Sequence, residues 1–501
     1  MKRFLEDVSR FRFLIVVVLL IVVLQVLPGP RPLDDAFITF RYARNLAQGW
    51  GFVYNPGQPV LGTTTPLYTL WLALCSLVVS RGDYPWLALV TNAVCDVAMI
   101  LLLRRLIRAL GQSPRISTVL AMGYLLNPVR IGVALGGMET SMVVLWLVAA
   151  SEAYVGRNRL VQAALFSALA VLTRPDAILL PALFAAHQLL VLRRIPWREG
   201  LAFLSLVGPW VVFAQMYFGS ALPHSIAAKS QAYFLYPTRA LTTLMDFLVT
   251  RSPYSNERAP LEVIGSGLLL LLWLYVIGGR EVIRAQARAA PLVLYPSLYM
   301  MGLALGNPHV FVWYYPPLIQ VPDTISLIGL STVLGRARFT FRSAAIGLCW
   351  LGWLGLQWVN LGPLVHDWPV NLREREVVYD QVAAALRDTI PPGSTIALPE
   401  IGVLGYAFSQ AVIIDTVGLV SPQAIPYLLK QPAPNQPHFY AVSNEVISAL
   451  QPDYVITLEV FVRPTLLLSF NFLNSYELID TWDADYFGSR GLLIFKRKIN
   501  V

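Results

Sequence analysis

Two adjacent carboxylates, Asp34 and Asp35, stand at the head of the first polar segment after the first long apolar run. If this segment is helical, one face carries the residues at positions i, i+4, i+7 and i+11, which are Asp34, Ile38, Arg41 and Asn45. Such a cluster in an apolar chain predicts chemistry on a charged or phosphorylated ligand. One carboxylate could act as a general base toward a hydroxyl while Arg41 holds its neighbour. The alternative is helix capping, which accounts better for one aspartate than for two.

The composition indicates a polytopic α-helical membrane protein. Of the 501 residues, 56% are hydrophobic and only 13% are charged, and the mean hydropathy is +0.59, values typical of many membrane spans. The net charge of +9 comes from arginine clusters between apolar runs, which indicates topology and not nucleic-acid binding. Cys75, Cys95 and Cys349 lie in apolar stretches, so neither a disulfide framework nor a zinc site is expected.

The first apolar run, Phe13–Leu27, follows basic residues and precedes Pro-Gly-Pro in place of a cleavage site. We therefore expect an uncleaved first span with the N-terminus on the inside of the membrane, and residues 29–65 as an outside loop. Together with this run there are about 11–13 predicted transmembrane helices. The further apolar segments cover 66–80, 86–103, 116–135, 139–155, 160–173, 177–192, 200–218, 261–278, 291–305, 314–333 and 343–361.

The basic cluster Arg104–Arg108 is expected in the cytoplasm. The number of apolar segments before this cluster conflicts with that location. Segments 66–80 and 86–103 separate this cluster from the outside loop, where the positive-inside rule requires an odd number of crossings. Either one of the two segments does not cross the membrane, or the rule fails locally.

The last part of the chain, residues 362–501, has the pattern of an extracytoplasmic α/β domain, after a transmembrane domain over 1–361. Arg373–Asp388 has a charged, amphipathic helical pattern, and another helix is expected near Asn444–Leu450. Short β-type runs are Ser394–Leu398, Ala411–Asp415, Asp453–Leu458 and Leu492–Lys496. Glu400 follows the first run, and it could face the membrane site because strand ends in α/β domains bind ligands; turn chemistry is an equally good account.

Three further charged residues are expected at the outer ends of spans. Glu139 follows two glycines that permit close backbone approach, and it marks either a ligand site or an ordinary helix start. Arg174 and Asp176 interrupt a long apolar stretch. They predict either a binding site or a tight outside turn with an internal ion pair.

A second outside loop, residues 219–260, contains Lys229 and His224 in a chain that otherwise prefers arginine. The lysine ammonium suits a lipid-linked phosphate, with His224 assisting; the alternative is an interfacial helix whose lysine meets lipid headgroups. His309 and Tyr314 lie in an aromatic-rich turn that enters a span. They are either pocket residues or members of an interfacial aromatic belt.

These motifs resemble a known family. The ordered set Asp34-Asp35-Ala-Phe-Ile-x-x-Arg41-Tyr42, Gly-x-Gly-Phe-Val-Tyr-Asn55-Pro-Gly and Gly-Thr-Thr-Thr65-Pro resembles the first outside loop of GT-C fold glycosyltransferases that use polyprenyl-phosphate sugars. The chain is most similar to the mycobacterial terminal arabinofuranosyltransferase type. It is more distantly similar to the protein mannosyltransferase and lipid A aminoarabinose transferase types. The Leu-Pro-x-Ser-x-x-x-Lys229 and Glu400-Ile-Gly-x-Leu-Gly-Tyr segments extend the similarity.

The resemblance implies a hexosyl- or pentosyltransferase of the bacterial cell (inner) membrane. It would move a sugar from a polyprenyl-phosphate carrier to an extracytoplasmic glycan, lipid or protein. Asp34 or Asp35 would be the base, and inversion would follow from a one-step geometry. The donor is the expected ligand, with no nucleic acid; paired carboxylates could hold a divalent metal, but no ligand set indicates one. The residues expected to bind substrate are Arg41, Tyr42, Asn45, Asn55, Thr65, Glu139, Arg174, Asp176, His224, Lys229, His309, Tyr314 and Glu400.

A transporter or lipid flippase is the rival interpretation, since it would also have many spans and charges at membrane depth. It would place carboxylates within spans and show two related halves, whereas the polar motifs here gather on outside loops. A membrane-anchored scaffold leaves the Asp34, Asp35 and Arg41 cluster without a task. The identity of the sugar is not encoded in these motifs.

Overall fold

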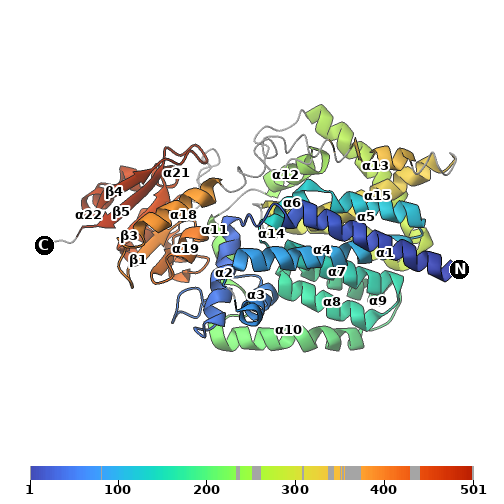
Figure 1. The fold of residues 1–501 in the computed structure, drawn as a ribbon, viewed down its shortest axis with the longest axis horizontal. Helices are drawn as coiled ribbons and strands as arrows, with labels where there is room; N and C mark the ends of the chain where they lie inside the picture. Colours follow the sequence, from blue (N-terminus) through green and yellow to red (C-terminus); the bar gives the residue numbers. More distant parts are fainter. Residues whose placement is uncertain are drawn as a thin grey trace.

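The computed structural model contains a helical domain followed by a C-terminal α/β domain, which lies at one end of the helices (Figure 1). The structure describes residues 2–80, 82–232, 237–250, 261–306, 310–336, 344–349, 351–352, 355, 374–428 and 441–498. The predicted boundary at residue 361 lies outside these ranges and stays a prediction, as does most of the predicted segment 343–361.

The helices of the first domain follow the predicted apolar segments closely. They are α1 (Lys2–Ile21), α2 (Asp34–Ala47), α3 (Pro66–Val79), α4 (Tyr84–Ala109), α5 (Pro114–Leu125), α6 (Pro128–Leu135), α7 (Thr140–Ser151), α8 (Leu160–Thr173), α9 (Leu179–Leu190), α10 (Trp197–Phe218), α11 (His224–Ala232), α12 (Pro237–Thr250), α13 (Leu261–Ala285), α14 (Ala290–Gly306) and α15 (Tyr315–Val333). Short turns of helix join them at η1 (Val22–Val26), η2 (Glu152–Gly156), η3 (Pro175–Ile178), η4 (Ala287–Ala289), η5 (Val312–Tyr314) and η6 (Leu334–Arg336).

The described helices confirm a multi-pass membrane protein, although not a number of crossings. Four of them are long and apolar enough to cross a bilayer, and the bent pair α5 and α6 makes up to five. Six shorter apolar helices of 10–17 residues accompany them. The 11–13 crossings therefore stay a prediction.

The contacts of α3 concern the two segments involved in the topology conflict noted above. Thr65 precedes α3 and places its hydroxyl 3.3 Å from that of Thr39 on α2. After α3 the chain returns to the same helix, because the Tyr84 ring lies 6.3 Å from the Phe40 ring. Both ends of α3 thus lie beside α2, and only the long helix α4 leads from there to Arg104, whose guanidinium covers the Phe13 ring of α1. The alternative in which the first of the two segments does not cross stays a prediction, and these contacts agree with it.

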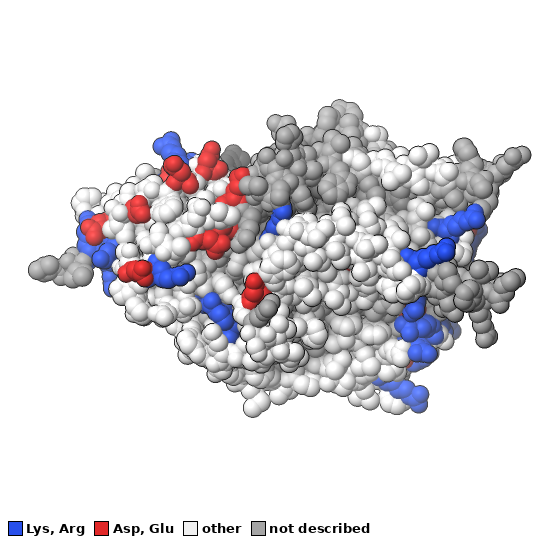
Figure 2. Space-filling view, in the orientation of Figure 1, with Lys and Arg blue, Asp and Glu red and all other residues white. Residues whose placement is uncertain are grey.

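Charged side chains are unevenly distributed over the surface. In the helical domain, the Lys and Arg visible in Figure 2 gather mainly at the end where α1 begins, opposite to the C-terminal domain. Exposed arginines there include Arg105 and Arg108. The acidic side chains visible in this view gather instead over the C-terminal domain.

A buried ion pair fixes the break between α5 and α6, which are bent by 49°. Arg130 donates to Asp96 Oδ2 at 2.5 Å and to the Leu125 carbonyl at 2.6 Å, and Gln25 donates to the same carboxylate oxygen at 2.8 Å. The end of α6 in turn receives the strand-like segment before α2, since Leu33 N donates to the Gly136 carbonyl at 3.0 Å. The pair therefore supports the segment that carries the two aspartates.

The C-terminal domain is a five-stranded mixed sheet with the order β2-β1-β3-β5-β4. Its strands are β1 (Thr395–Leu398), β2 (Val412–Asp415), β3 (Tyr454–Leu458), β4 (Tyr476–Trp482) and β5 (Leu492–Arg497). Its helices are α18 (Glu374–Leu386), α19 (Val403–Ala407), α20 (Asn444–Leu450), α21 (Glu459–Val462) and α22 (Phe470–Ser475), with η7 (Pro422–Tyr427) and η8 (Leu466–Leu468). β1, β2 and β3 are parallel, and β5 runs antiparallel to both β3 and β4. The predicted α/β domain is confirmed, with β4 as the strand that the sequence did not reveal.

Candidate functional site

A cavity of about 400 Å³ lies where α2, the loop before α3 and the outer ends of α7, α8, α11 and α14 meet the C-terminal domain. Its described polar lining comes from segments far apart in the sequence. The lining side chains with polar groups are Asp35, Thr39, Thr63, Thr64, Thr65, Glu139, Arg174, Asp176, Ser225, Lys229, Tyr299, Trp313 and Tyr314. Seven of the fifteen predicted site residues are therefore brought together here.

The two adjacent aspartates have different surroundings. Asp35 lines the cavity and is half-buried, and among the described residues its carboxylate makes no hydrogen bond or ion pair. Asp34 is buried and points to the C-terminal domain, where its carboxylate accepts from Gly402 N at 3.0 Å and from Val403 N at 2.8 Å. Asp34 thus caps the start of α19, and Asp35 is the aspartate with a free carboxylate at the cavity.

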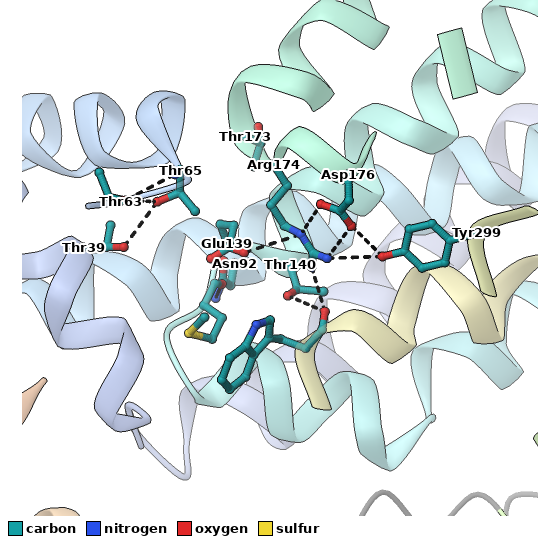
Figure 3. A network of polar contacts seen from close by, with 12 residues as sticks. Thr39, Thr63, Thr65, Asn92, Glu139, Thr140, Thr173, Arg174, Asp176 and Tyr299 are labelled. Atoms are coloured by element: carbon teal, nitrogen blue, oxygen red, sulfur yellow. Dashed lines mark hydrogen bonds and ion pairs between the residues drawn. The ribbon is translucent and has the colours of Figure 1, made fainter. Parts of the chain in front are cut away.

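Three threonine hydroxyls form one polar wall of the cavity. Thr65 Oγ1 lies 3.3 Å from Thr39 Oγ1 and 3.0 Å from Thr63 Oγ1, and Figure 3 shows this group on one side of the view. The hydroxyls bond to one another and can still donate or accept toward a bound hydroxylated molecule. Thr65, which was predicted to bind substrate, lines the cavity.

A second polar wall is the network around Arg174, which Figure 3 shows beyond Glu139. Arg174 donates to both oxygens of Asp176 at 3.0 and 2.6 Å, and to the Trp313 carbonyl at 2.8 Å. Glu139 lies 3.7 Å away on the other side of the guanidinium. Tyr299 donates to Asp176 at 2.6 Å. The predicted internal ion pair of Arg174 and Asp176 is present, and the same pair lines the cavity.

Lys229 differs from Arg174 in its partners. Its ammonium lies 5.1 Å from the centroid of the Phe311 ring, a cation–π distance, and no carboxylate pairs with it among the described residues. Tyr314 lies under the Arg174 guanidinium at 4.4 Å. His224 does not line the cavity, although its backbone N–H bonds the Leu61 carbonyl at 2.9 Å, and His309 lies outside the described residues.

Arg41 is not at the cavity, in contrast to its predicted binding role. Its guanidinium is fully buried and is surrounded by carbonyl oxygens of the C-terminal domain. It donates to the carbonyls of Gly405, Phe408 at 3.5 Å and Ala411 at 3.2 Å, and to that of Tyr54 at 2.8 Å. Every direction of the guanidinium fork is in use, so Arg41 holds the two domains together.

The other polar residues of the segment 29–65 also have structural partners. Asn55 bonds both the amide and the carbonyl of Ile413, at 3.1 and 2.9 Å, and so extends the edge of β2. Asn45 donates to the Val53 and Tyr54 carbonyls at 2.9 Å each. The Tyr42 hydroxyl donates to the Val60 carbonyl at 2.6 Å. These three predicted binding residues therefore shape the loop and its contact with the tail.

Glu400 takes part in the same domain interface and does not line the cavity. Its carboxylate accepts from Arg375 at 2.7 Å and from the Tyr379 hydroxyl, while Glu376 accepts from Asp34 N at 3.2 Å. Burial and the nearby Glu400 raise the pKa of Asp34 to about 8, although Arg375 and the Val403 amide act in the opposite direction.

Close approach of the domains explains two glycines in the tail. A Cβ on Gly402 would lie 1.9 Å from the Asp34 carbonyl oxygen, and a Cβ on Gly405 would lie 1.9 Å from the Tyr54 hydroxyl. Both positions require glycine for lack of space. The carboxyl ends of the parallel strands, where ligand binding was predicted, thus serve domain docking.

The tail also contributes to the cavity wall. Leu419 lines the cavity from a turn in which Asp415 accepts from Val417 N at 2.8 Å and Val420 N at 3.0 Å. Burial raises the pKa of Asp415 to about 6. Asp415 therefore shapes the turn that places Leu419 at the cavity.

Tyr299 and Ser225 are site residues that the sequence did not reveal. Both line the cavity, and the Ser225 hydroxyl is buried without a partner among the described residues. Tyr299 is one of two tyrosines within the apolar helix α14, and this was a weak signal. The described residues contain no group of three or more His, Cys, Asp or Glu that could hold a metal.

Comparisons with known proteins agree with this architecture. Residues 370–496 match a family model described as a domain of unknown function, DUF8728. The chain is similar to the terminal beta-(1->2)-arabinofuranosyltransferase of Corynebacterium glutamicum, at 29% identity over 243 residues, or 41% of this chain. The match spans about a third (34%) of that relative's length.

Two solved structures share the fold over nearly the whole chain. The oligosaccharyltransferase of Archaeoglobus fulgidus, in complex with Zn and sulfate, has 13% identity and a TM-score of 0.58, covering 97% of this chain and 73% of that one. ArnT from Cupriavidus metallidurans, bound to undecaprenyl phosphate, has 12% identity and a TM-score of 0.55, covering 98% of each chain. The chain is therefore a multi-pass membrane protein with the GT-C fold.

Proposed function

We propose that this protein is a membrane glycosyltransferase that transfers a sugar from a polyprenyl-phosphate carrier to a hydroxyl of an acceptor. The observation that carries the proposal is the composition of the cavity. It combines the carboxylate of Asp35, which has no partner in the described part of the chain, with the cations Lys229 and Arg174. Glycosyl transfer from a lipid phosphate needs a base for the acceptor and positive charge for the departing phosphate.

Asp35 is the proposed general base. It would take the proton of the acceptor hydroxyl as that oxygen attacks the anomeric carbon. The bond from this carbon to the carrier phosphate breaks in the same step, and the phosphate leaves with the electron pair. A single displacement inverts the anomeric centre. The threonine wall of Thr39, Thr63 and Thr65 offers hydrogen bonds that would orient sugar or acceptor hydroxyls.

Lys229 is the proposed counter-charge of the departing phosphate. Arg174 is already bound to Asp176 and faces Glu139, so much of its charge is balanced within the protein. Lys229 rests against an aromatic ring and has no carboxylate partner among the described residues. Its ammonium is therefore the more available cation, and Arg174 would chiefly position the Asp176 and Tyr299 wall.

The reaction is proposed to occur on the outer side of the bacterial cell membrane. The basic end of the helical domain would face the cytoplasm by the positive-inside rule, which leaves the cavity and the C-terminal domain outside. Support for the donor comes from the fold shared with ArnT, whose structure holds undecaprenyl phosphate. The arabinofuranosyltransferase similarity favours a pentosyl donor, and the acceptor is a cell-envelope glycan, lipid or protein.

The test is transfer from radiolabelled polyprenyl-phosphate pentoses and hexoses to membrane-extract acceptors, with the purified protein in lipid. Wild type, Asp35→Asn and Asp34→Asn are compared at equal amounts of folded protein. Transfer that is lost in Asp35→Asn supports the assignment. Normal transfer in that variant would exclude Asp35 as the base, and no transfer from any donor would favour a lipid flippase, which flipping of a labelled carrier in vesicles would then detect.

A further inference from the structure

A second cavity, of about 580 Å³, lies at the opposite end of the helical domain from the C-terminal domain. It is bordered by the first part of α1, the end of α4 and the turn after α7. Its lining residues are Phe11, Phe13, Leu14, Leu101, Arg104, Arg105, Arg108, Glu152 and Arg157. None of these side chains belongs to the candidate active site.

The charge in this cavity is strongly positive. Among the described lining residues there are four arginines and one carboxylate. That carboxylate, Glu152, accepts from Arg157 Nε at 2.6 Å. Arg105 and Arg108 are exposed and make no ion pair with any side chain that the structure describes. The cavity therefore holds cationic groups that are available to an anion.

The other half of the lining is apolar and continues the membrane-facing surface of α1. Phe11 is 64% exposed, and the Arg104 guanidinium lies 4.4 Å above the Phe13 ring. A guanidinium that stacks on an aromatic ring stays at the boundary between apolar and polar surroundings. Cations and apolar side chains thus border the same space, as they do at the depth of lipid headgroups.

We propose that this cavity binds the phosphate headgroup of an anionic phospholipid, with acyl chains along α1. The positive-inside rule requires arginines at this end of the protein, but it does not require them to line one cavity. Arg198 and Arg280 are exposed at this end and do not line the cavity. The apolar lining distinguishes a lipid from a free phosphate ion, which would gain nothing from Phe11 or Leu14. This inference is independent of the proposed transfer reaction.

The test measures lipid retention by native mass spectrometry and thermal stability of the purified, delipidated protein. The probes are dioleoylphosphatidylglycerol, dioleoylphosphatidylcholine and inorganic phosphate. Wild type should retain and be stabilised by phosphatidylglycerol alone. The variant Arg105→Gln/Arg108→Gln should bind it about twenty-five-fold more weakly, since each basic residue near an anionic headgroup contributes about a factor of five. Both arginines are exposed, so the variant should fold.

The control is Arg198→Gln/Arg280→Gln, which removes equal charge from the same domain and should bind like wild type. Equal weakening in both double variants would overturn the proposal in favour of diffuse attraction to a basic surface. Equal binding of both phospholipids would overturn it, and so would equal stabilisation by inorganic phosphate. Arg104→Gln adds a second test, because loss of the stacked cation should also weaken retention of phosphatidylglycerol.

Discussion

The two faces of α2 carry similar polar residues but have different tasks. On the face toward the C-terminal domain, Asp34 and Arg41 are buried, and their polar atoms meet backbone partners of the tail. On the face toward the cavity, Asp35 and Thr39 line open space. Buried polar groups are ordinarily satisfied within the protein. Asp35 is only half-buried and has no partner among the described residues, so its carboxylate is available to a ligand in the cavity.

The contrast separates neighbours in sequence. Successive residues of a helix point about 100° apart, and in this structure Asp34 bonds the C-terminal domain while Asp35 lines the cavity. The face of α2 toward the C-terminal domain, here called the docking face, bonds main-chain atoms of the tail. These atoms are present whatever side chains the tail carries. The face of α2 toward the cavity shares that cavity with side chains at α7, η3 and α11, and these elements come together only when the membrane domain is folded.

Asp35→Asn should give the largest effect, on activity alone. Loss of a general base lowers kcat by about 10²- to 10⁴-fold, whereas the melting temperature should change little because the carboxylate has no partner among the described residues. The measurement is a transfer assay on matched amounts of protein, together with thermal unfolding. Asp34→Asn is the control, and it should lower stability more than it lowers kcat. If Asp34→Asn lowered kcat and Asp35→Asn lowered stability, the catalytic role would belong to Asp34 and the structural role to Asp35.

The helix was predictable from sequence, but the meaning of its faces was not. Spacing identified α2 and grouped Asp34 with Arg41 and Asn45 as one polar face. The partners of that face come from the tail, more than 350 residues later for Gly402 and Gly405. Periodicity reports which side chains share a face, and it does not report which distant segment covers that face.

Arg41→Met should cause the largest loss of domain docking. The change removes the donors of several buried carbonyls, each of which costs about 1 to 3 kcal/mol when left unsatisfied. Limited proteolysis between the domains and hydrogen exchange in α19 measure the effect. Gly402→Ala tests the same contact by a steric route, since its Cβ would meet the Asp34 backbone. Unchanged exchange in both variants would show that the docking face is dispensable.

Lys229→Gln should reduce transfer less than the loss of Asp35, by about 10- to 100-fold, because Arg174 retains part of the positive charge at the cavity. Lys229→Arg should recover part of the activity, since it keeps the charge but changes its shape. The check is kcat and KM for the lipid-linked donor. Full activity in Lys229→Gln would leave the cavity without its proposed phosphate partner.

The tail shows a similar limit of sequence-based prediction. Four of its five strands were predicted, while β4 was missed because it is an edge strand whose residues are mostly exposed, with the burial alternation of a half-buried strand absent. The turn at Asp415 follows a predicted strand, and it is stabilised by backbone hydrogen bonds to the Asp415 carboxylate. That this turn places Leu419 at the membrane cavity depends on docking, which local sequence does not contain.

The smallest expected effect is a pH dependence of docking that belongs to Asp34. Its pKa is raised from 3.8 to about 8 when the domains are docked, mainly by burial. A raised pKa means that the docked state binds the proton more tightly, so its contribution is fully present below about pH 4 and is lost as the pH rises through about 8.

Over one pH unit near neutrality this linkage amounts to about 1 kcal/mol, which hydrogen exchange in α19 can detect. Protonated Asp34 still accepts from the α19 amides through its carbonyl oxygen, so docking survives protonation. In Asp34→Asn the titrating group is gone, and the dependence should flatten. A pH profile that is the same in both proteins would assign the dependence to another group at the interface, such as Glu400, which is buried beside Arg375 and Tyr379.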